Sequence, residues 1–492
     1  MTEDRGVGLK GWLSGPRSKD AKAEDRAEKL FPVHEHRIAV LPMANISPDP
    51  QDEYFADGLT EELISSISNI SELGVISRTS AMTYKGTSKK VKEIGRELDV
   101  GSVLEGSVRK AGKRMRITVQ LIDVRNDKHL WVQSYDREFN DVFAVQSDIA
   151  KQVAAALRIR ILPEETRQLE KKPTKSSEAY DLYLKGRYFW NERTKEGLLK
   201  AIECFKQAIR LDASFALAFS GVADSYCVLG NNGHIPYIEA FEKQRENALK
   251  AVQFDESSAE AHTSLAAALQ SDYNWEGAER EFNRAIEHNP NYATAHQWYG
   301  ILLLIVGKFG KALREASKAQ LLDPMSLQIS VFRGNVYDAM RKYDLAEGQL
   351  RKVLEVEPNF VNARNALCGV LLHQGRYDEM EREGRELLRL TNNHPATKAW
   401  IAAGYAFAGR KEEARTILDE VKTLPPGTHV AVQPFVYAHV ALGEKEKAIE
   451  LIEKEWEGHA DWIPALKLEP LLASIRFEPR VIEVLRKIGL EN

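Results

Sequence analysis

The chain has 492 residues, of which 43% are hydrophobic and 28% charged, and a net charge of -4 at neutral pH. This balance is typical of a folded globular protein and excludes a chain without a core and a strongly basic nucleic-acid binder. The length exceeds what one core usually supports, so we expect at least two structural units. Because no apolar run approaches the ~18 residues that span a bilayer and no signal-peptide pattern opens the chain, we expect a cytoplasmic protein with no membrane segment.

Cysteine and histidine usage indicates neither disulfides nor a metal site. The 3 cysteines, Cys204, Cys227 and Cys368, are odd in number and include no C-x-x-C pair, so we expect small core residues. A single His-x-His pair at His34 and His36 has no further ligands nearby, and we interpret it as part of a linker. We therefore predict no metal and no cofactor.

The first 36 residues combine charged and small side chains with a Gly15-Pro16 step, and no apolar stripe supports a helix there. We interpret residues 1–36 as a disordered tail, with a tethering or regulatory role as the alternative.

Residues 37–162 show the pattern of a small α/β domain. Short apolar runs alternate with amphipathic segments, and the last two strand candidates alternate apolar and polar residues around an Asn126-Asp127 turn. The expected strands are 38–41, 74–77, 102–108, 115–121 and 129–135, and the expected helices are 60–70, 91–98 and 143–161. The alternation predicts an antiparallel meander with one solvent-exposed face.

Catalytic residues do not stand out in this domain. Asp57, Glu61 and Glu62 form an acidic cluster that we interpret as the capped start of a helix, where carboxylates are stabilised by free backbone N–H groups. The basic run over 109–116 suits a solvated strand face. Glycine-rich phosphate loops and a nucleophile-base pair are missing from the sequence, so no catalytic residue is proposed.

Five short segments of this domain together resemble one known family. They read IAVLP at 38–42, YFADGLTEEL at 54–63, ISRTS at 76–80, IGREL at 94–98 and VLEGSV at 103–108. This series is similar to the TolB-like amino-terminal domain. The resemblance implies helical repeats behind the domain and an association with class III adenylate cyclase or winged-helix DNA-binding domains. With 36 residues ahead of it, we expect neither of those domains in this chain.

Residues 163–177 are expected to be a linker, and residues 178–458 a helical repeat array. Small residues return every 34 positions in windows that begin at 259, 293, 327, 361, 395 and 429. The eighth position holds Ala266, Gly300, Gly334, Cys368, Ala402 and Val436, and the twentieth holds Ala278, Ala312, Ala346, Met380, Ala414 and Ala448. This pattern resembles the tetratricopeptide repeat, in which small residues let two helices approach closely.

Two less regular units around Gly186 and Ala223 precede the regular windows, which makes about eight repeats. Residues 459–492 are expected to form a helical cap, because an open repeat end exposes its core.

The resemblance to tetratricopeptide repeats also implies a binding surface. In such arrays positions 2, 5, 9 and 12 of each first helix line the concave groove, and in the regular windows none of these positions holds Lys or Arg. A carboxylate clamp needs cationic side chains there, so we expect an extended or helical protein segment held by amides and apolar contacts. The expected contact residues are Thr263, Gln297, Asn335, Asn362, Asn365, Leu372 and Gln433.

The predicted fold is therefore an α+β multidomain chain, a small TolB-like α/β domain followed by an all-α tetratricopeptide repeat superhelix. We expect a non-enzymatic interaction scaffold or a signal-transduction protein whose partner is a protein or peptide and not a nucleic acid. The alternative is a regulatory component that works with a nucleotide cyclase or a transcriptional regulator, with the α/β domain sensing a ligand or partner. Self-association into a homo-oligomer stays open.

Overall fold

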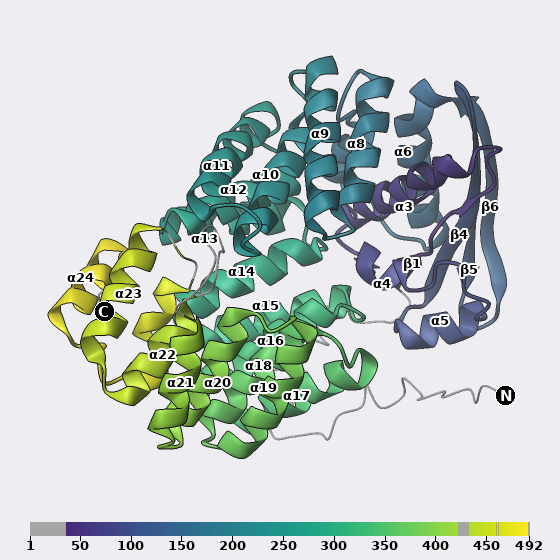
Figure 1. The fold of residues 1–492 in the computed structure, drawn as a ribbon. Helices are drawn as coiled ribbons and strands as arrows, with labels where there is room; N and C mark the ends of the chain where they lie inside the picture. Colours follow the sequence, from purple (N-terminus) through teal and green to yellow (C-terminus); the bar gives the residue numbers. More distant parts are fainter. Residues whose placement is uncertain (1–35, 422–431, 459, 461, 491–492) are drawn as a thin grey trace.

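The computed structural model describes residues 36–421, 432–458, 460 and 462–490. Within them an α/β domain leads into helices that pair in sequence order and wind into a superhelix, as predicted (Figure 1). Residues 1–35 of the predicted disordered tail over 1–36, including His34, lie outside the described residues. Among the described helices, none combines the length and apolar composition that crossing a bilayer requires.

The sheet of the α/β domain mixes parallel and antiparallel pairing. Its strands are β1 (Arg37–Val40), β2 (Ala44–Asn45), β3 (Gly74–Val75), β4 (Ser102–Ala111), β5 (Arg114–Asp123) and β6 (Lys128–Glu138). The order is β3-β1-β4-β5-β6, with β2 beside β4. β1 runs parallel to β3 and β4, whereas β4, β5 and β6 form the predicted antiparallel meander.

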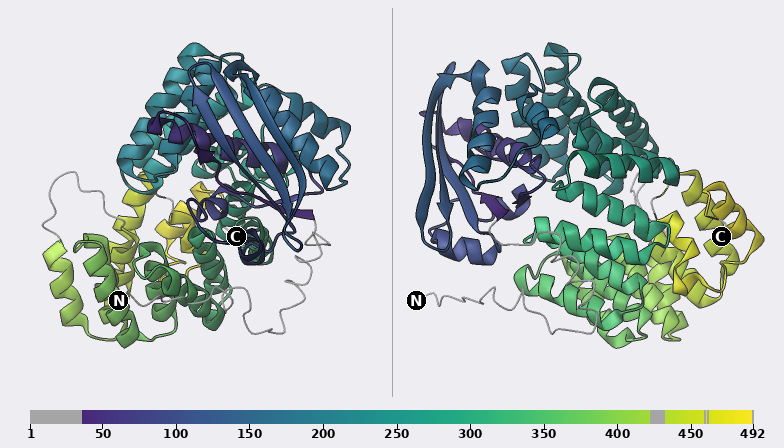
Figure 2. Two further views of the ribbon diagram at one scale, coloured as in Figure 1. Left: turned by 90° about the vertical axis from the view of Figure 1, so that its right-hand side faces the viewer. Right: turned by 180° about the vertical axis from the view of Figure 1, so that it is seen from behind.

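One face of this sheet packs against α3 (Glu53–Ser68) and α6 (Val142–Ala156). On the other face α5 (Val91–Glu97) packs with Ala39 of β1 and Val103 of β4, and the area over β5 and β6 is open (Figure 2, left). The domain also contains α4 (Arg78–Met82) and the short 3-10 turns η2 (Pro50–Asp52) and η3 (Phe139–Asp141). Leu59 and Leu63 of α3 are fully buried with Ile117 and Leu121 of β5 in one core. Gly106 has no space for a side chain, because a Cβ there would come within 2.2 Å of the Thr118 carbonyl oxygen.

The acidic cluster does not cap a helix, so that prediction was wrong. Because α3 begins at Glu53, Asp57 and Glu61 lie inside it, and the Asp57 carboxylate pairs with Lys85 at 2.6 Å. The basic run is also only partly solvated. Its Lys110 points to the first repeat and pairs with Asp181 at 2.6 Å.

The interval that we expected to be a linker carries a helix, α7 (Pro163–Glu170), which is bound to the α/β domain. The buried Glu165 carboxylate accepts hydrogen bonds from the backbone and hydroxyl of Ser71 at 2.9 and 2.6 Å. It also accepts one from the Leu162 backbone at 2.8 Å, which holds the first turn of the helix. The path from the domain to the repeats is therefore fixed along α7.

Eight pairs of helices follow in the described part of the chain. They are α8 (Ser177–Trp190) with α9 (Lys195–Leu211), α10 (Ala216–Asn231) with α11 (Tyr237–Phe254), α12 (Ala259–Ser271) with α13 (Trp275–His288), α14 (Ala293–Ile305) with α15 (Phe309–Leu322), α16 (Leu327–Ala339) with α17 (Tyr343–Val356), α18 (Val361–His373) with α19 (Tyr377–Leu390), α20 (Pro395–Phe407) with α21 (Lys411–Val421), and α22 (Gln433–Leu442) with α23 (Lys445–Glu457). The first helices of five pairs begin at the predicted window starts, from 259 to 395. The small eighth position serves packing between repeats as well. A Cβ on Gly300 would come within 2.8 Å of the Phe332 ring in the next repeat.

One hydrophobic core joins the α/β domain to the first two repeats. Tyr180 of α8 is fully buried between Phe139 and Tyr183, and its hydroxyl accepts a hydrogen bond from Gln146 of α6 at 2.7 Å. Tyr183 in turn packs against Phe205 of α9. The α/β domain therefore seals the N-terminal end of the array, in the way that a capping repeat does.

The C-terminal segment covers the last repeats and also contacts the third repeat. It consists of η4 (Ile463–Lys467), η5 (Pro470–Leu472) and α24 (Pro479–Lys487). Leu466 and Leu472 are buried in the core of the last repeats. The Trp275 indole N–H, at the start of α13, donates to the Ile488 carbonyl at 2.6 Å. The end of the chain therefore contacts the third repeat (Figure 1).

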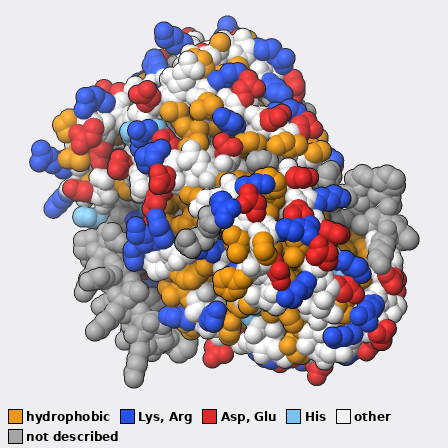
Figure 3. Space-filling model, turned by 90° about the vertical axis from the view of Figure 1, so that its left-hand side faces the viewer, with side chains coloured by type: hydrophobic (Ala, Val, Ile, Leu, Met, Phe, Trp, Pro, Cys, Tyr) orange, Lys and Arg blue, Asp and Glu red, His pale blue; other side chains and the backbone are white. Residues whose placement is uncertain are grey.

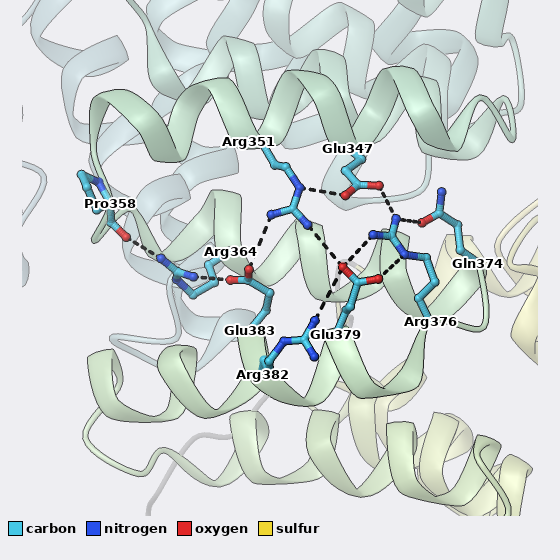
Figure 4. A network of polar contacts seen from close by, with 9 residues as sticks. All are labelled: Glu347, Arg351, Pro358, Arg364, Gln374, Arg376, Glu379, Arg382 and Glu383. Atoms are coloured by element: carbon cyan, nitrogen blue, oxygen red, sulfur yellow. Dashed lines mark hydrogen bonds and ion pairs between the residues drawn. The ribbon is translucent and has the colours of Figure 1, made fainter. Parts of the chain in front are cut away.

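Ion pairs at a constant spacing of 29 residues link consecutive repeats. Each joins a second helix to the turn inside the next repeat. The pairs are Glu279 with Lys308, Glu347 with Arg376, Glu381 with Arg410, and Arg415 with Glu444. The last pair has the opposite polarity. Around Arg376 these ion pairs belong to a larger network, in which Arg351 lies between Glu347, Glu379 and Glu383 (Figure 4).

Candidate partner-binding groove

The inward positions of the first repeats face the α/β domain. With Gly186 in the eighth position, Arg187 takes the ninth, and it points at α3. The Arg187 Nε donates to the Glu61 carboxylate at 2.7 Å, and Arg78 of α4 lies 3.1 Å from the same carboxylate. Ser65 of α3 contacts Glu260, the second position of the third repeat, at 3.3 Å. In these repeats α3 therefore covers inward positions that a partner segment would use.

The acidic side chains between α3 and the first repeats differ in how far their pKa values are shifted. Burial alone would raise the pKa of Glu61, but Arg187 and Arg78 bring it below its usual value. Burial, together with the carboxylates of Glu61 and Glu260, raises the pKa of the neighbouring Glu62 to about 8. Burial also raises the pKa of Asp224, the ninth position of the second repeat, to about 6, although the Ser264 hydroxyl donates to it at 2.6 Å. Glu62 is consequently protonated at neutral pH.

The loops between repeats also bind the α/β domain. Asp323 is buried and accepts hydrogen bonds from the backbone and hydroxyl of Ser80 at 3.0 and 2.5 Å. Asn289 donates to the Ser68 hydroxyl at 2.7 Å, and Asn291 to the Ser68 carbonyl at 3.0 Å. These contacts have no signature in the sequence, because an Asn or Asp next to a Pro is an ordinary helix end.

The C-terminal half of the groove is covered by residues 463–472, which we name the hook. The His373 ring, at the end of α18, lies between two carboxylates, with Nδ1 2.9 Å from Asp338 and Nε2 2.9 Å from Glu469 of the hook. Burial lowers the pKa of His373, but these two hydrogen bonds outweigh it and raise the pKa to about 10. His373 is therefore a cation at neutral pH and ties the hook to the groove.

Three of the predicted contact residues lie exposed between these two covers. They are Asn335 on α16 and Asn362 and Asn365 on α18. The Asn362 amide donates to the side chain of Gln328, which is also exposed, at 2.9 Å. Gln297 on α14 is half-buried. Of the predicted contact residues, these amides on α16 and α18 are the ones that are exposed to solvent.

The remaining predicted contact residues are engaged within the chain. Thr263 is buried, and its hydroxyl donates to the Ala259 carbonyl at 2.8 Å. Leu372 is buried in the core of the middle repeats. Gln433 is half-buried and donates to the Tyr437 hydroxyl at 2.8 Å. These three side chains serve packing, and we do not keep them in the candidate surface.

A cavity of ≈ 430 Å³ lies where the C-terminal segment meets the third and fourth repeats. Trp275, Leu302 and Val306 line it from the repeats, and Lys467 and Leu490 from the C-terminal segment.

On the face of the molecule that carries the C-terminal end, acidic and basic side chains are interspersed with hydrophobic ones (Figure 3). The charges on that face therefore alternate in sign over short distances.

Comparisons with known families support the repeat assignment. Tetratricopeptide repeat profiles match residues 281–314 and 333–395, which confirms the repeats. The profile of the second domain of HilA/YgeH-like transcriptional regulators matches residues 34–152. The α/β domain is thus similar to that domain, and its expected resemblance to the TolB-like domain is not confirmed.

Two curated proteins are similar over part of their length. A protein named putative adenylate cyclase 3 from Rhizobium meliloti is 36% identical over 235 residues, which are 47% of this chain and 40% of that protein. The transcriptional regulator HilA of Salmonella typhimurium is 21% identical over 326 residues, which are 64% of this chain and 57% of that protein. The chain therefore spans about half the length of these relatives.

Solved repeat proteins are similar in part as well. The thermophilic repeat protein TTC0263 of Thermus thermophilus has 19% identity and a TM-score of 0.34, and covers 39% of this chain and 99% of its own. A tetratricopeptide repeat protein of Parabacteroides merdae has 12% identity and a TM-score of 0.39, and covers 54% of this chain and 100% of its own. At such TM-scores neither likeness decides anything about function.

Proposed function

We propose that this chain is a non-enzymatic scaffold that holds a segment of a partner protein against the exposed inward side of α16 and α18. The observation that carries the proposal is the row of exposed amides Asn335, Asn362 and Asn365, bordered by α3 at one end and the hook at the other. An amide side chain both donates and accepts hydrogen bonds, so it can pair with the backbone of an extended segment whatever its sequence.

In this proposal the α/β domain has a structural role and a sensory one. It caps the array, and the outer face of its sheet is exposed to solvent over β5 and β6, where a second ligand or partner would bind. A signalling protein in the cytoplasm fits these features, because a partner-binding array fused to a sensory domain couples two binding events.

A second function is supported by the relatives. Similarity to proteins named as an adenylate cyclase and as a transcriptional regulator favours a regulatory component that works with such a protein. A cyclase assay on the chain alone, and a DNA mobility shift at modest salt, separate this candidate from direct catalysis and direct DNA binding.

The scaffold proposal is tested by affinity capture with the full chain. The variant changes Asn335, Asn362 and Asn365 to Ala, and quantitative mass spectrometry compares its captured proteins with those of the wild type. A matched control changes three exposed asparagines outside the groove, Asn126, Asn140 and Asn283.

A partner that is lost with the groove variant and kept with the control supports the proposal. An unchanged set of partners rejects it, because removing three amides should weaken binding by about tenfold or more.

A further inference from the structure

The sheet of the α/β domain has two edges, and the described residues cover only one of them. Beside β3, the backbone N–H of Ser77 donates to the Leu322 carbonyl of the array at 2.8 Å. Arg37 of β1 donates to the Leu321 carbonyl at 2.7 Å. At the other edge β6 follows only β5 in the strand order, and it lies at the periphery of the molecule (Figures 1 and 2).

β6 lacks most of the features that keep edge strands from pairing. Natural edges are short, charged, or interrupted by proline or a bulge. β6 has 11 residues without proline or glycine, and its stretch over 130–135 carries no charge. Leu130 and Val132 are 41% and 53% exposed. A bulge interrupts the strand next to Leu130, and the segment from Trp131 onward is regular.

The regular segment is complementary to itself. An antiparallel copy paired about Ser134 sets Trp131 of one chain opposite Arg137 of the other, twice. An arginine over an indole ring is attractive. Arg137 is exposed, and its described hydrogen bond goes to the Asp136 carbonyl of its own strand. Between these pairs Gln133 and Tyr135 meet, so no like charges face each other.

We propose that β6 pairs with β6 of a second copy of this chain, which joins two sheets into one across a twofold axis at Ser134. Backbone N–H and C=O groups of the free edge supply the affinity, and the Trp131 and Arg137 pairs set the register. This self-association is independent of the amide surface on α16 and α18, so either can hold without the other.

Substitutions at Ser134, the residue on the proposed twofold axis, test the pairing. Ser134 is exposed and pairs with itself in this register, so Ser134→Lys and Ser134→Glu each place like charges directly opposite. Thr118→Lys is the matched control, because it removes the same Thr118–Ser134 contact of 3.1 Å from β5, one strand inside the edge. Sedimentation velocity of the full chains over about 5 to 200 µM measures the dimer, in the range of a weak interface.

We expect the wild type and Thr118→Lys to dimerise equally and both Ser134 variants to dimerise at least about fivefold more weakly. An equimolar mixture of the Lys and Glu variants should recover the dimer, because opposite charges then meet on the axis. Circular dichroism checks that each variant is folded. A wild type that stays monomeric, or a dimer that the Ser134 changes leave intact, would overturn the proposal.

Discussion

Replacing Glu61 or Glu62, which are adjacent on α3, by glutamine should change the free energy of unfolding in opposite directions at alkaline pH. Glu62 has its pKa raised from about 4.5 to about 8 by burial and by its neighbours Glu61 and Glu260. A group with a raised pKa contributes stability that is complete below the unfolded pKa and is lost as pH rises through the folded pKa. For Glu62 this window runs from about pH 4.5 to about pH 8. Glutamine cannot ionise, so the Glu62→Gln variant should not lose this stability at alkaline pH.

The full shift corresponds to ~5 kcal/mol at about 1.4 kcal/mol per pKa unit. Because Glu62 keeps partial contact with solvent, we expect ~2 kcal/mol at pH above 8. Urea unfolding of the full chain at acidic, neutral and alkaline pH measures it. Glu62→Gln should match the wild type in acid and exceed its unfolding free energy in alkali.

Glu61→Gln is the matched control. Arg187 and Arg78 both pair with the Glu61 carboxylate, so its loss leaves two half-buried cations without that partner. Removing one partner of such a pair costs ~3 kcal/mol. If Glu62→Gln follows the wild type at every pH, or if both variants change stability in the same direction in alkali, the assigned protonation of this contact is wrong.

Three further changes probe the array. His373→Ala should free the hook and make it cleavable in limited proteolysis. In the wild type the stabilisation from His373 should be complete below about pH 6.5 and fade as pH rises through about 10, so cleavage should increase in alkali. Gly186→Ala should lower the unfolding free energy by ~2 kcal/mol, because the added Cβ would come within 2.5 Å of the Phe205 ring of α9. Gly369→Ala should raise it by ~0.5 kcal/mol, because a Cβ there would meet nothing within 4 Å. Thermal denaturation measures both. Arg415→Glu should cost ~0.5 kcal/mol, and adding Glu444→Arg should restore only part of it, because Glu444 also pairs with Lys447 and His439; a double-mutant cycle measures the coupling.

The repeats could be predicted because their signal is local and periodic. The small residues that recur every 34 positions lie where two helices meet, and the helices begin at Ala259, Ala293 and Leu327 as the windows require. The meander was equally accessible, since alternation along a strand directly reports one buried face. Of the three cysteines expected in the core, Cys204 and Cys368 are buried, whereas Cys227 is half-buried.

The contacts between distant parts of the chain could not be predicted. Asp323 and Asn289 stand at helix ends, where such residues usually serve the local turn, and their partners lie more than 200 residues away in the sequence. The exposed amides were found from the repeat positions alone. Thr263 and Leu372 occupy equivalent inward positions but are buried, because burial there depends on how tightly neighbouring helices and the hook pack.

The contact between Trp275 and Ile488 changes the mechanical character of the array. A solenoid whose repeats touch only their neighbours behaves as a spring, because small rotations between successive units add up along its length. Here the end of the chain is fastened to the third repeat, so the curvature between them cannot relax without breaking that hydrogen bond and the packing around it. The amide surface on α16 and α18 lies within this closed span. If a partner binds there as proposed, it meets a groove of set width, and binding should cost little reorganisation of the array.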